Sequence, residues 1–154
     1  MSKSKIKRTI YFCSTQDAFG EFSNFAHYPI VLDKKTWKTT EHYFQAQKFV
    51  TTDPVYAEKI RNASKPMQAA QLGRSRKKPL RKDWESIKVS IMAKAVWAKF
   101  TQHEILKKLL LSTEDAKLVE HTSRDSYWGN GGDGSGKNML GQVLMKAREK
   151  LSKK

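Results

Sequence analysis

The sequence predicts a helix-rich α+β fold, built as a single domain with a small β-sheet. β-branched and aromatic residues gather in short runs near the N-terminus, whereas apolar residues recur at helical spacing from residue 39 onward. A chain of 154 residues can bury one hydrophobic core, and it contains no internal repeat or long linker. We therefore expect a basic arm over residues 1–8 and one domain over residues 9–154.

Short runs of strand-forming residues predict the sheet. Residues 9–13 (TIYFC) combine β-branched and aromatic side chains, which favour a strand. Residues 30–37 (IVLDKKTW) carry a polar turn at 33–35, which indicates a hairpin or a strand with a turn. Residues 118–119 (LV) add a further short strand. We expect the sheet to lie near the N-terminal third of the chain.

The first helix is expected over residues 39–50. Thr39 or Thr40 can act as its N-cap, and Glu41 then lies in the first turn, where a negative charge stabilises the helix dipole. Asp53 followed by proline is the pattern of an N-cap and a first helical position, which predicts a second helix of about ten residues.

Four further helices are expected. Ser64 can cap a short one that Gly73 ends as the residue after the C-cap. The longest is expected over 83–100, and two more over 105–111 and 138–151. The apolar stripe of the longest helix consists of Trp84, Ile87, Ile91, Ala95 and Ala98. The inward residues of the last helix are Leu140, Val143, Leu144, Ala147 and Leu151.

The formal net charge of +15 is concentrated in three segments. Residues 1–8, 74–82 and 144–154 together carry +14 of it, and the rest of the chain is nearly neutral. A basic surface attracts phosphate backbones, so a nucleic-acid binder without enzymatic activity is one hypothesis, and the terminal segments can add weak nonspecific affinity. The segment 74–82 lies beside Trp84 and favours another hypothesis, a patch that holds the phosphate of an anionic substrate.

Composition excludes several classes of protein. Cys13 is the single cysteine, so no intramolecular disulfide and no cysteine cluster for a metal can form, and the four histidines match no metal motif. No apolar run approaches the length of a membrane span, and no signal-peptide pattern is present. We expect a cytoplasmic protein that does not associate with a membrane.

A glycine-rich stretch at 129–136 (GNGGDGSG) matches two nucleotide-binding patterns without their context. No hydrophobic strand precedes it, as a dinucleotide fingerprint requires, and Asn138 stands where a P-loop needs Ser or Thr for magnesium. Two readings stay open. The loop can present backbone N–H groups to an anion, or it can be a mobile surface loop.

A polar stripe on the first helix is the more informative feature. Glu41, Gln45 and Lys48 fall in line at helical spacing, beside aromatic residues. From spacing alone, a solvated helical face with one salt bridge is the simpler interpretation. If the stripe packs inward, burial would instead shift the pKa of the carboxyl or ammonium group, as acid–base chemistry requires.

Two further segments combine an acid with a tryptophan near the end of an element. They are Asp83-Trp84 and the run from Asp125 to Trp128. A tryptophan offers a flat face for a heterocycle, and a loop carboxylate offers a second acid. The alternatives are a core position for Trp84 and a turn or capping role for Asp125.

A series of motifs, in order, resembles the YbiA/NADAR family over residues 9 to 151. They are FSNF at 22–25, W-x-T-x-EHYFQAQKF at 37–49, A-x-x-LGR at 69–74, RKDW at 81–84, KF-x-QH at 99–103, LVEHT at 118–122, D-x-YWG at 125–129 and G-x-N-x-LG-x-x-LM at 136–145. Agreement of several long motifs is far more specific than the glycine pattern.

The resemblance implies the YbiA-like fold and an N-glycosidase that needs no metal or cofactor. Bacterial members of this type hydrolyse the bond between ribose 5-phosphate and the aminopyrimidine in early riboflavin biosynthesis intermediates, which is a damage-control activity. The implied partner is therefore a small ribosylamine phosphate. Related NADAR members act on ADP-ribose attached to guanine, so an ADP-ribosyl hydrolase acting on nucleic acid is the alternative.

By matching position, the resemblance implies catalytic roles for three residues. Glu41 is the essential acid, Asp125 assists it, and Lys48 matches a position that can form a Schiff base with the opened sugar. A carboxylate can stabilise the oxocarbenium-like state of the breaking C1′–N bond or activate water. The residues expected to bind substrate are Asn24, Arg74, Trp84, Trp128, Gly129 and Lys137.

Overall fold

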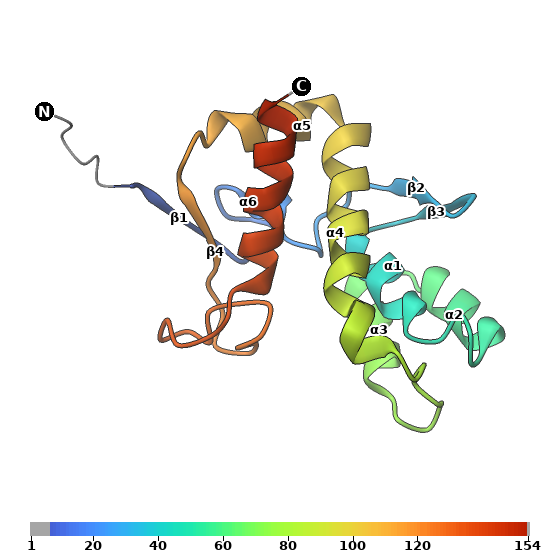
Figure 1. Ribbon diagram of the computed structural model, residues 1–154. Coiled ribbons are helices and arrows are strands. Elements are labelled where there is room, and N and C mark those ends of the chain that lie inside the picture. Colours follow the sequence, from blue (N-terminus) through green and yellow to red (C-terminus); the bar gives the residue numbers. More distant parts are fainter. Residues whose placement is uncertain (1–6, 154) are drawn as a thin grey trace, which may run out of the picture. The chain divides into compact units, whose positions relative to one another are not determined.

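The computed structural model describes residues 7–153 and shows an α+β fold (Figure 1). Over these residues, six α-helices accompany two separate two-stranded sheets, which confirms the expected fold class. Contacts divide the chain into two compact units, Asn24–Glu104 and the segments that flank it. Residues 1–6 of the expected basic arm lie outside the described residues. No helix within residues 7–153 is long and apolar enough to cross a membrane.

The flanking segments contain a parallel pair of strands. β1 (Thr9–Phe12) pairs with β4 (Lys117–Glu120), with Thr9 opposite Lys117. The location of the sheet therefore differs from the expectation, because its first strand pairs with a segment near the other end of the chain. A parallel pair needs a long crossover connection, so local sequence does not reveal the partner.

The last helix, α6 (Met139–Ser152), packs against β4. The five residues that were expected to face inward are all buried: Leu140, Val143, Leu144, Ala147 and Leu151. On the same helix, Arg148 Nη1 donates to Thr113 Oγ1 and to the Ala116 carbonyl, both at 2.8 Å. These bonds tie α6 to the turn between α5 (Glu104–Ser112) and β4.

The Asn24–Glu104 unit combines a hairpin with four helices. The hairpin, β2 (Ile30–Leu32) and β3 (Lys35–Trp37), turns through Asp33 and Lys34, which both have positive φ. The helices are α1 (Thr40–Gln47), α2 (Pro54–Arg61), α3 (Pro66–Arg74) and α4 (Trp84–Gln102). α1 packs against the other three. Every residue of α1 is buried as a result.

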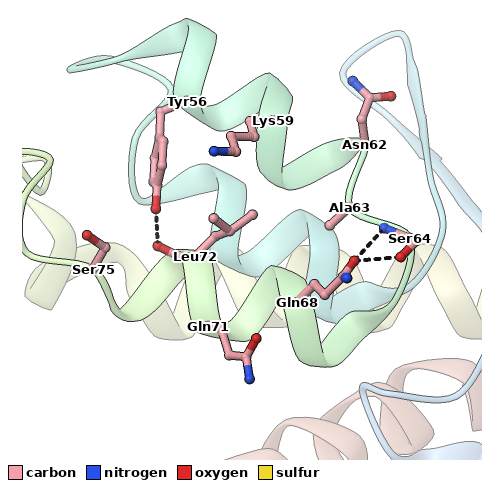
Figure 2. Close-up of a pocket in the computed structure, with 9 residues that line it drawn as sticks. All are labelled: Tyr56, Lys59, Asn62, Ala63, Ser64, Gln68, Gln71, Leu72 and Ser75. Atoms are coloured by element: carbon pink, nitrogen blue, oxygen red, sulfur yellow. Dashed lines mark hydrogen bonds between the residues drawn. The ribbon is translucent and has the colours of Figure 1, made fainter.

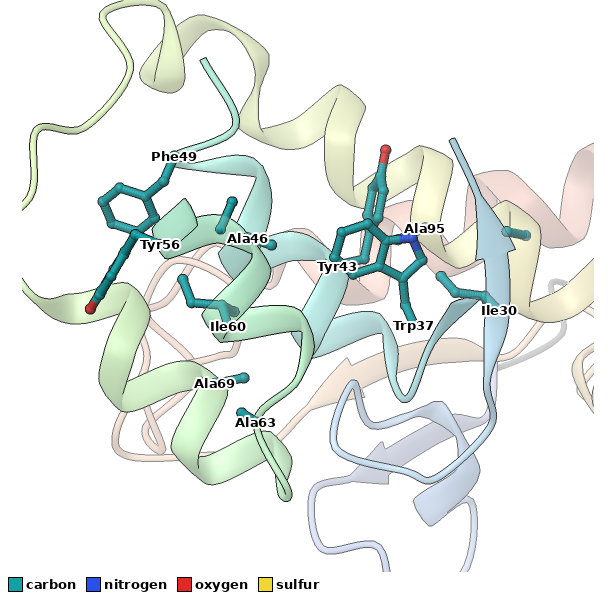
Figure 3. Packing of buried hydrophobic residues seen from close by; sticks show 12 residues of the cluster. Ile30, Trp37, Tyr43, Ala46, Phe49, Tyr56, Ile60, Ala63, Ala69 and Ala95 are labelled. Carbon is teal, nitrogen blue, oxygen red and sulfur yellow. The ribbon is translucent and has the colours of Figure 1, made fainter. Parts of the chain in front are cut away.

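Aromatic pairs organise the core of this unit (Figure 3). The Trp37 ring meets Tyr43 edge-on with centroids 5.1 Å apart, and Phe49 meets Tyr56 edge-on at 4.9 Å. Edge-to-face geometry is favourable because the positive rim of one ring meets the negative face of the other. The first pair fixes α1 against β3, and the second fixes the turn that follows α1 against α2.

The capping predictions for α1 and α2 are confirmed. The Thr39 hydroxyl accepts from His42 N, and the Asp53 carboxylate accepts from Tyr56 N. The capping of α3 is different from the expectation. This helix starts after Lys65, and Gly73 lies inside its last turn. A Cβ at Gly73 would come within 1.9 Å of Gln45 Oε1, so glycine is needed there for close approach of α3 to α1.

The longest helix begins where expected, but without a side-chain cap. Asp83 precedes α4, and its carboxylate accepts from Arg81 Nε at 2.7 Å instead of from a backbone N–H of the helix. Arg81 also donates to the Gln47 carbonyl at 3.2 Å. The basic segment before α4 is thereby fastened to the end of α1.

Candidate active site

The polar stripe of α1 points into the protein. Glu41, Gln45 and Lys48 are only 9%, 7% and 8% exposed. The alternative of a solvated helical face is therefore wrong. The helical spacing of the three residues was correctly predicted. Their burial does not follow from this spacing, because it arises from the packing of α2, α3 and α4 against α1.

The Glu41 carboxylate is held by its neighbour one turn later. Gln45 Nε2 donates to Glu41 Oε2 at 2.7 Å. An N–H donor at this distance stabilises a carboxylate anion, and the effect is stronger where water is scarce. Gln45 thus fixes the orientation of the buried Glu41 carboxyl group inside the Asn24–Glu104 unit.

Asn24 positions the start of α1. Its carbonyl accepts from Glu41 N at 3.2 Å, and its Oδ1 accepts from Thr40 Oγ1 at 2.8 Å. Its Nδ2 donates to Met92 Sδ at 3.4 Å. Both polar atoms of the Asn24 side-chain amide are therefore hydrogen-bonded within the protein, and its backbone carbonyl holds the backbone N–H of Glu41.

Lys48 is a buried cation in an unusual environment. Its Nζ lies 3.4 Å from the Gly73 carbonyl and stands 5.7 Å from the ring centre of Phe44 and 5.9 Å from that of Trp84. The pKa of Lys48 is lowered to about 8, first by burial and then by the positive charge of Arg76, against the opposite effect of Glu41. With this pKa, roughly a tenth of the Lys48 amine is neutral at pH 7, far more than for an ordinary lysine.

Trp84 is both a core residue and a wall beside Lys48. Its indole is 4% exposed and packs edge-on against Phe44, with centroids 5.1 Å apart. The core interpretation of Trp84 is confirmed. The same packing places the tryptophan and phenylalanine rings around the ammonium group, where they contribute cation–π attraction.

Asp125 organises the loop before α6. Its Oδ1 accepts from the backbone N–H groups of Tyr127 and Trp128 at 2.9 and 2.8 Å. The turn role that competed with catalysis is therefore present. Position 129 needs glycine, because a Cβ there would come within 2.6 Å of Thr122 Cγ2. Lys137 Nζ lies 5.5 Å from the ring centre of Tyr127.

The glycine-rich loop uses its backbone donors internally. Gly131 N donates to Asp125 O, and Gly136 N donates to Asn130 O. Lys137 N donates in the same way, to Ser126 O. These N–H groups are occupied, which disfavours the idea that they hold an anion. Within residues 7–153, no group of three or more His, Cys, Asp or Glu side chains is arranged to hold a metal ion.

A separate open pocket of about 680 Å³ lies beside α2 and α3 (Figure 2). Tyr56 Oη donates to the Leu72 carbonyl at 2.6 Å in its wall, and Ser64 donates to Gln68 Oε1 from both its N–H and its hydroxyl. None of the nine residues that line it belongs to the site expected from the sequence. The expected chemistry is centred on α1 instead.

Comparison with known proteins identifies the family. The NADAR domain model matches residues 11–152. The chain belongs to the NADAR family. N-glycosidase YbiA of Escherichia coli is 60% identical over 143 residues, which cover 93% of this chain and 88% of the relative. A riboflavin biosynthesis protein of Vibrio vulnificus is 40% identical over 146 residues, covering 95% of this chain but 39% of that protein.

The fold is shared with a solved structure. The NMR structure of the E. coli protein YbiA matches with a TM-score of 0.87 at 58% sequence identity, covering 96% of this chain and 88% of that one. The YbiA-like fold expected from the motifs is therefore confirmed for this NADAR protein.

In this NADAR protein the expected site residues fall into two groups. Those in the Asn24–Glu104 unit are Asn24, Glu41, Lys48, Arg74 and Trp84. Those in the loop before α6 are Asp125, Trp128, Gly129 and Lys137. Glu41 lies on α1, Lys48 follows its last residue, and Trp84 at the start of α4 lies beside Lys48. Asn24 is bonded to the first turn of α1 through its carbonyl. Arg74 is exposed and affects Lys48 through its charge.

Sequence reasoning did not select three residues that shape this site. Gln45 was noted on the stripe but given no role, although it binds Glu41. Gly73 was interpreted as the residue that ends a helix. Arg76 was interpreted as one of several cations in the basic segment 74–82. The signal for Gly73 was its place in the LGR motif; nothing local distinguished Arg76 within the basic segment.

Proposed function

We propose that this NADAR protein is an N-glycosidase that hydrolyses the C–N bond between ribose 5-phosphate and the aminopyrimidine of early riboflavin biosynthesis intermediates. The names of relatives at 60% and 40% identity, an N-glycosidase and a riboflavin biosynthesis protein, support the reaction and its substrate class. The observation that carries the proposal is the buried Glu41 carboxylate, fixed by Gln45 at 2.7 Å.

Glu41 acts where charge develops. Breaking the C1′–N bond places positive charge on C1′ and the ring oxygen. The carboxylate stabilises this charge, or takes a proton from the water whose oxygen bonds to C1′. The leaving nitrogen keeps the bonding electron pair and accepts a proton. The products are ribose 5-phosphate and the free aminopyrimidine.

Lys48 offers a covalent variant of the same reaction. A ribosylamine opens to an imine, and the neutral amine of Lys48 adds to C1′ and expels the aminopyrimidine. Water then hydrolyses the Lys48 imine and releases the sugar phosphate. The pKa of about 8 supports this variant. Borohydride, which reduces an imine to a stable amine, would leave the sugar attached to Lys48 if this route is used.

The decisive variant is Glu41→Gln, which keeps the shape of the side chain and removes its charge. We expect turnover to fall by about 10²–10⁴-fold, the usual contribution of a catalytic acid or base. Release of ribose 5-phosphate from the pyrimidine ribosylamine phosphate measures it. Glu104→Gln, at an exposed position at the start of α5, is the matched control. Wild-type turnover in Glu41→Gln would remove Glu41 from the mechanism.

The same assay tests the proposed second acid. Asp125→Asn keeps an oxygen that can accept from Tyr127 N and Trp128 N, so the turn survives while the negative charge is lost. If Asp125 assists at the sugar or the leaving amine, turnover falls although the melting temperature does not. Unchanged turnover would restrict Asp125 to the turn.

An ADP-ribosyl hydrolase that acts on guanine in nucleic acid is the second candidate. The observation that favours it is the exposed basic segment beside the Lys48 environment, with Arg74, Arg76 and Lys77 on its surface. Turnover of ADP-ribosylated DNA and of the free ribosylamine phosphate should be compared directly. Activity on the DNA alone would replace the first proposal with the second.

A further inference from the structure

Asn138 stands directly before α6 and lies outside the set of residues expected to act on the substrate. Its side chain is buried, with 8% exposed, and its backbone is left-handed, with a φ of 52° and a ψ of 46°. Asparagine adopts this conformation more readily than most residues, but the conformation still costs free energy. A buried amide on a strained backbone indicates that the contacts of Asn138 keep it in place.

The Asn138 amide extends the hydrogen bonding of β4. Its Nδ2 donates to the Leu118 carbonyl and its Oδ1 accepts from Glu120 N, both at 2.9 Å. The next residue, His121, donates instead to Phe12 O in β1. Since alternate residues of a strand bond to opposite sides, the amide occupies the edge of β4 away from β1, where another strand would pair. Asn138 thereby joins the start of α6 to the end of β4.

Gly141, one turn into α6, makes room for this contact. A Cβ at position 141 would collide with the Leu118 carbonyl and with both polar atoms of the Asn138 side chain. Glycine is therefore needed at 141 for the Asn138 amide to reach β4. The spacing of asparagine and glycine in the G-x-N-x-LG part of the last motif, at 136–141, is explained by this packing.

The backbone at the start of α6 holds the segment from Asp125 to Gly129. Asn138 N donates to the Gly129 carbonyl at 2.9 Å, and the first two N–H groups of α6 donate to the Tyr127 and Trp128 carbonyls at 3.0 Å. These carbonyls satisfy donors that the Asn138 side chain does not cap, because its amide is bonded to β4. The Asp125 carboxylate accepts from Trp128 N, so Trp128 is bonded at both its N–H and its carbonyl.

We propose that Asn138 is a positioning residue for the N-glycosidase reaction, which acts by fixing α6 to β4 and so holding Trp128 and Asp125 where they meet the substrate. The inference rests on the proposed function, and within it on Trp128 stacking on the heterocycle and Asp125 assisting at the sugar or the leaving amine. Asn138 touches no reacting atom in this role. Its loss moves the start of α6, and with it the backbone of Trp128.

Two substitutions separate the amide from the backbone strain. Asn138→Ala removes both bonds to β4 and keeps a side chain at positive φ, whereas Asn138→Gly removes the same bonds and relieves the strain. Asn138→Gly is therefore the principal variant, because it should stay folded. Val143→Ala is the matched control, since Val143 is a buried apolar residue of the same helix and its truncation lowers stability without removing a hydrogen bond.

NMR of the full chain without substrate tests the positioning itself. In Asn138→Gly we expect the backbone N–H signals of Tyr127 and Trp128 and the indole N–H signal of Trp128 to shift. Hydrogen exchange at the first two N–H groups of α6 should become about tenfold faster, because their acceptors are no longer held. Val143→Ala should leave these signals and exchange rates close to those of the wild type.

Steady-state turnover of the ribosylamine phosphate, at a temperature where every variant is folded, tests the consequence for the reaction. We expect kcat/KM of Asn138→Gly to fall by roughly 10- to 100-fold, the effect of a small misplacement in a catalytic site. KM should rise, because Trp128 contacts the heterocycle before the bond breaks. A merely structural loss would lower the active fraction and the apparent kcat and leave KM unchanged, as we expect for Val143→Ala.

Two results would overturn the positioning role. One is a wild-type KM in Asn138→Gly, and the other is an unchanged set of Tyr127 and Trp128 signals in that variant. If the signals shift as expected but the wild-type protein releases no ribose 5-phosphate, the contact between Asn138 and the loop stands and the proposed function fails.

Discussion

The Gln45 amide lies between the Glu41 carboxylate and Gly73, and both neighbours fix its orientation. Nε2 faces the carboxylate at 2.7 Å, because the amide oxygen in that place would repel it. Oε1 is buried and accepts no hydrogen bond from the described residues. It faces Gly73, at the position where a Cβ would stand, so the glycine Cα–H is its neighbour.

Replacing Gln45 by leucine should therefore damage catalysis more than folding. Gln45→Leu keeps much of the volume and removes the donor to Glu41. A hydrogen bond to a charged group contributes about 1.5–3 kcal/mol, so we expect kcat/KM to fall by roughly 10- to 100-fold. Steady-state kinetics measure this, with Gln71→Leu on the exposed face of α3 as control. Equal kcat/KM in Gln45→Leu and wild type would contradict the role.

At the residue scale, motif matching and structure give different kinds of information. The resemblance supplied Glu41, Lys48 and Trp84, and helical spacing aligned the first two. Neither indicated that Gln45 binds Glu41 or that Arg76 shares a carbonyl with Lys48. Those contacts depend on how closely α3 approaches α1, which is set by packing and not by local pattern.

At the scale of the element, α1 is a polar helix in a buried position, and His42 secures it. Its Nε2 donates to the Ala63 carbonyl at 2.9 Å, and its Nδ1 lies 2.8 Å from the Thr39 hydroxyl. Burial favours the neutral imidazole, in which Nδ1 accepts from this hydroxyl. Burial, followed by the charges of Lys38 and His27, lowers the pKa of His42, against the raising effect of the Ala63 carbonyl.

The stability of the protein should consequently depend on pH through His42. Its pKa is lower in the folded state, so the unfolded chain binds the proton more readily. The stabilisation is complete above the unfolded value near 6.5 and is lost as pH falls below it, by up to about 1.4 kcal/mol per pH unit. Urea unfolding between pH 7.5 and about 5 measures the slope. His42→Gln should flatten it, and an equal slope in both proteins would exclude His42 as the source.

Element boundaries were predictable where a side chain caps the helix. Thr39 and Asp53 mark α1 and α2 as expected, because their hydrogen bonds are local. Gly73 was expected to follow a helix, where glycine tolerates positive φ, yet it serves close approach inside α3. A glycine that ends a helix and a glycine that allows close helix packing look alike in a sequence. Only the position of the neighbouring helix distinguishes the two roles.

At the scale of the molecule, the charged residues of the three basic segments differ in how they are paired. The middle segment is partly neutralised by Asp53 and Asp83, and its Arg76 donates to the Gly73 carbonyl, which Lys48 Nζ also approaches. In the described terminal residues, Lys7, Arg8 and Lys146 are exposed. The sequence showed where the charge is concentrated, but pairing with acids distant in the chain, as between Lys78 and Asp53, became visible only in the fold.

This division predicts that nucleic-acid affinity and turnover can be separated. Replacing Lys7, Arg8, Lys146 and Lys153 by glutamine removes exposed terminal charges and leaves the α1 site intact. Binding to unmodified DNA should weaken, and the slope of log K against log salt should shrink by about 0.9 for each phosphate that the variant no longer neutralises. If Glu41 and its neighbours on α1 form the substrate site, as proposed, hydrolysis of the ribosylamine phosphate should stay at the wild-type rate. Glu41→Gln should behave in the opposite way, with turnover impaired and the salt slope nearly unchanged, because this variant removes no positive charge. If the glutamine variant lost turnover together with DNA binding, the terminal charges would belong to the substrate site, and the nucleic-acid substrate would become the stronger proposal.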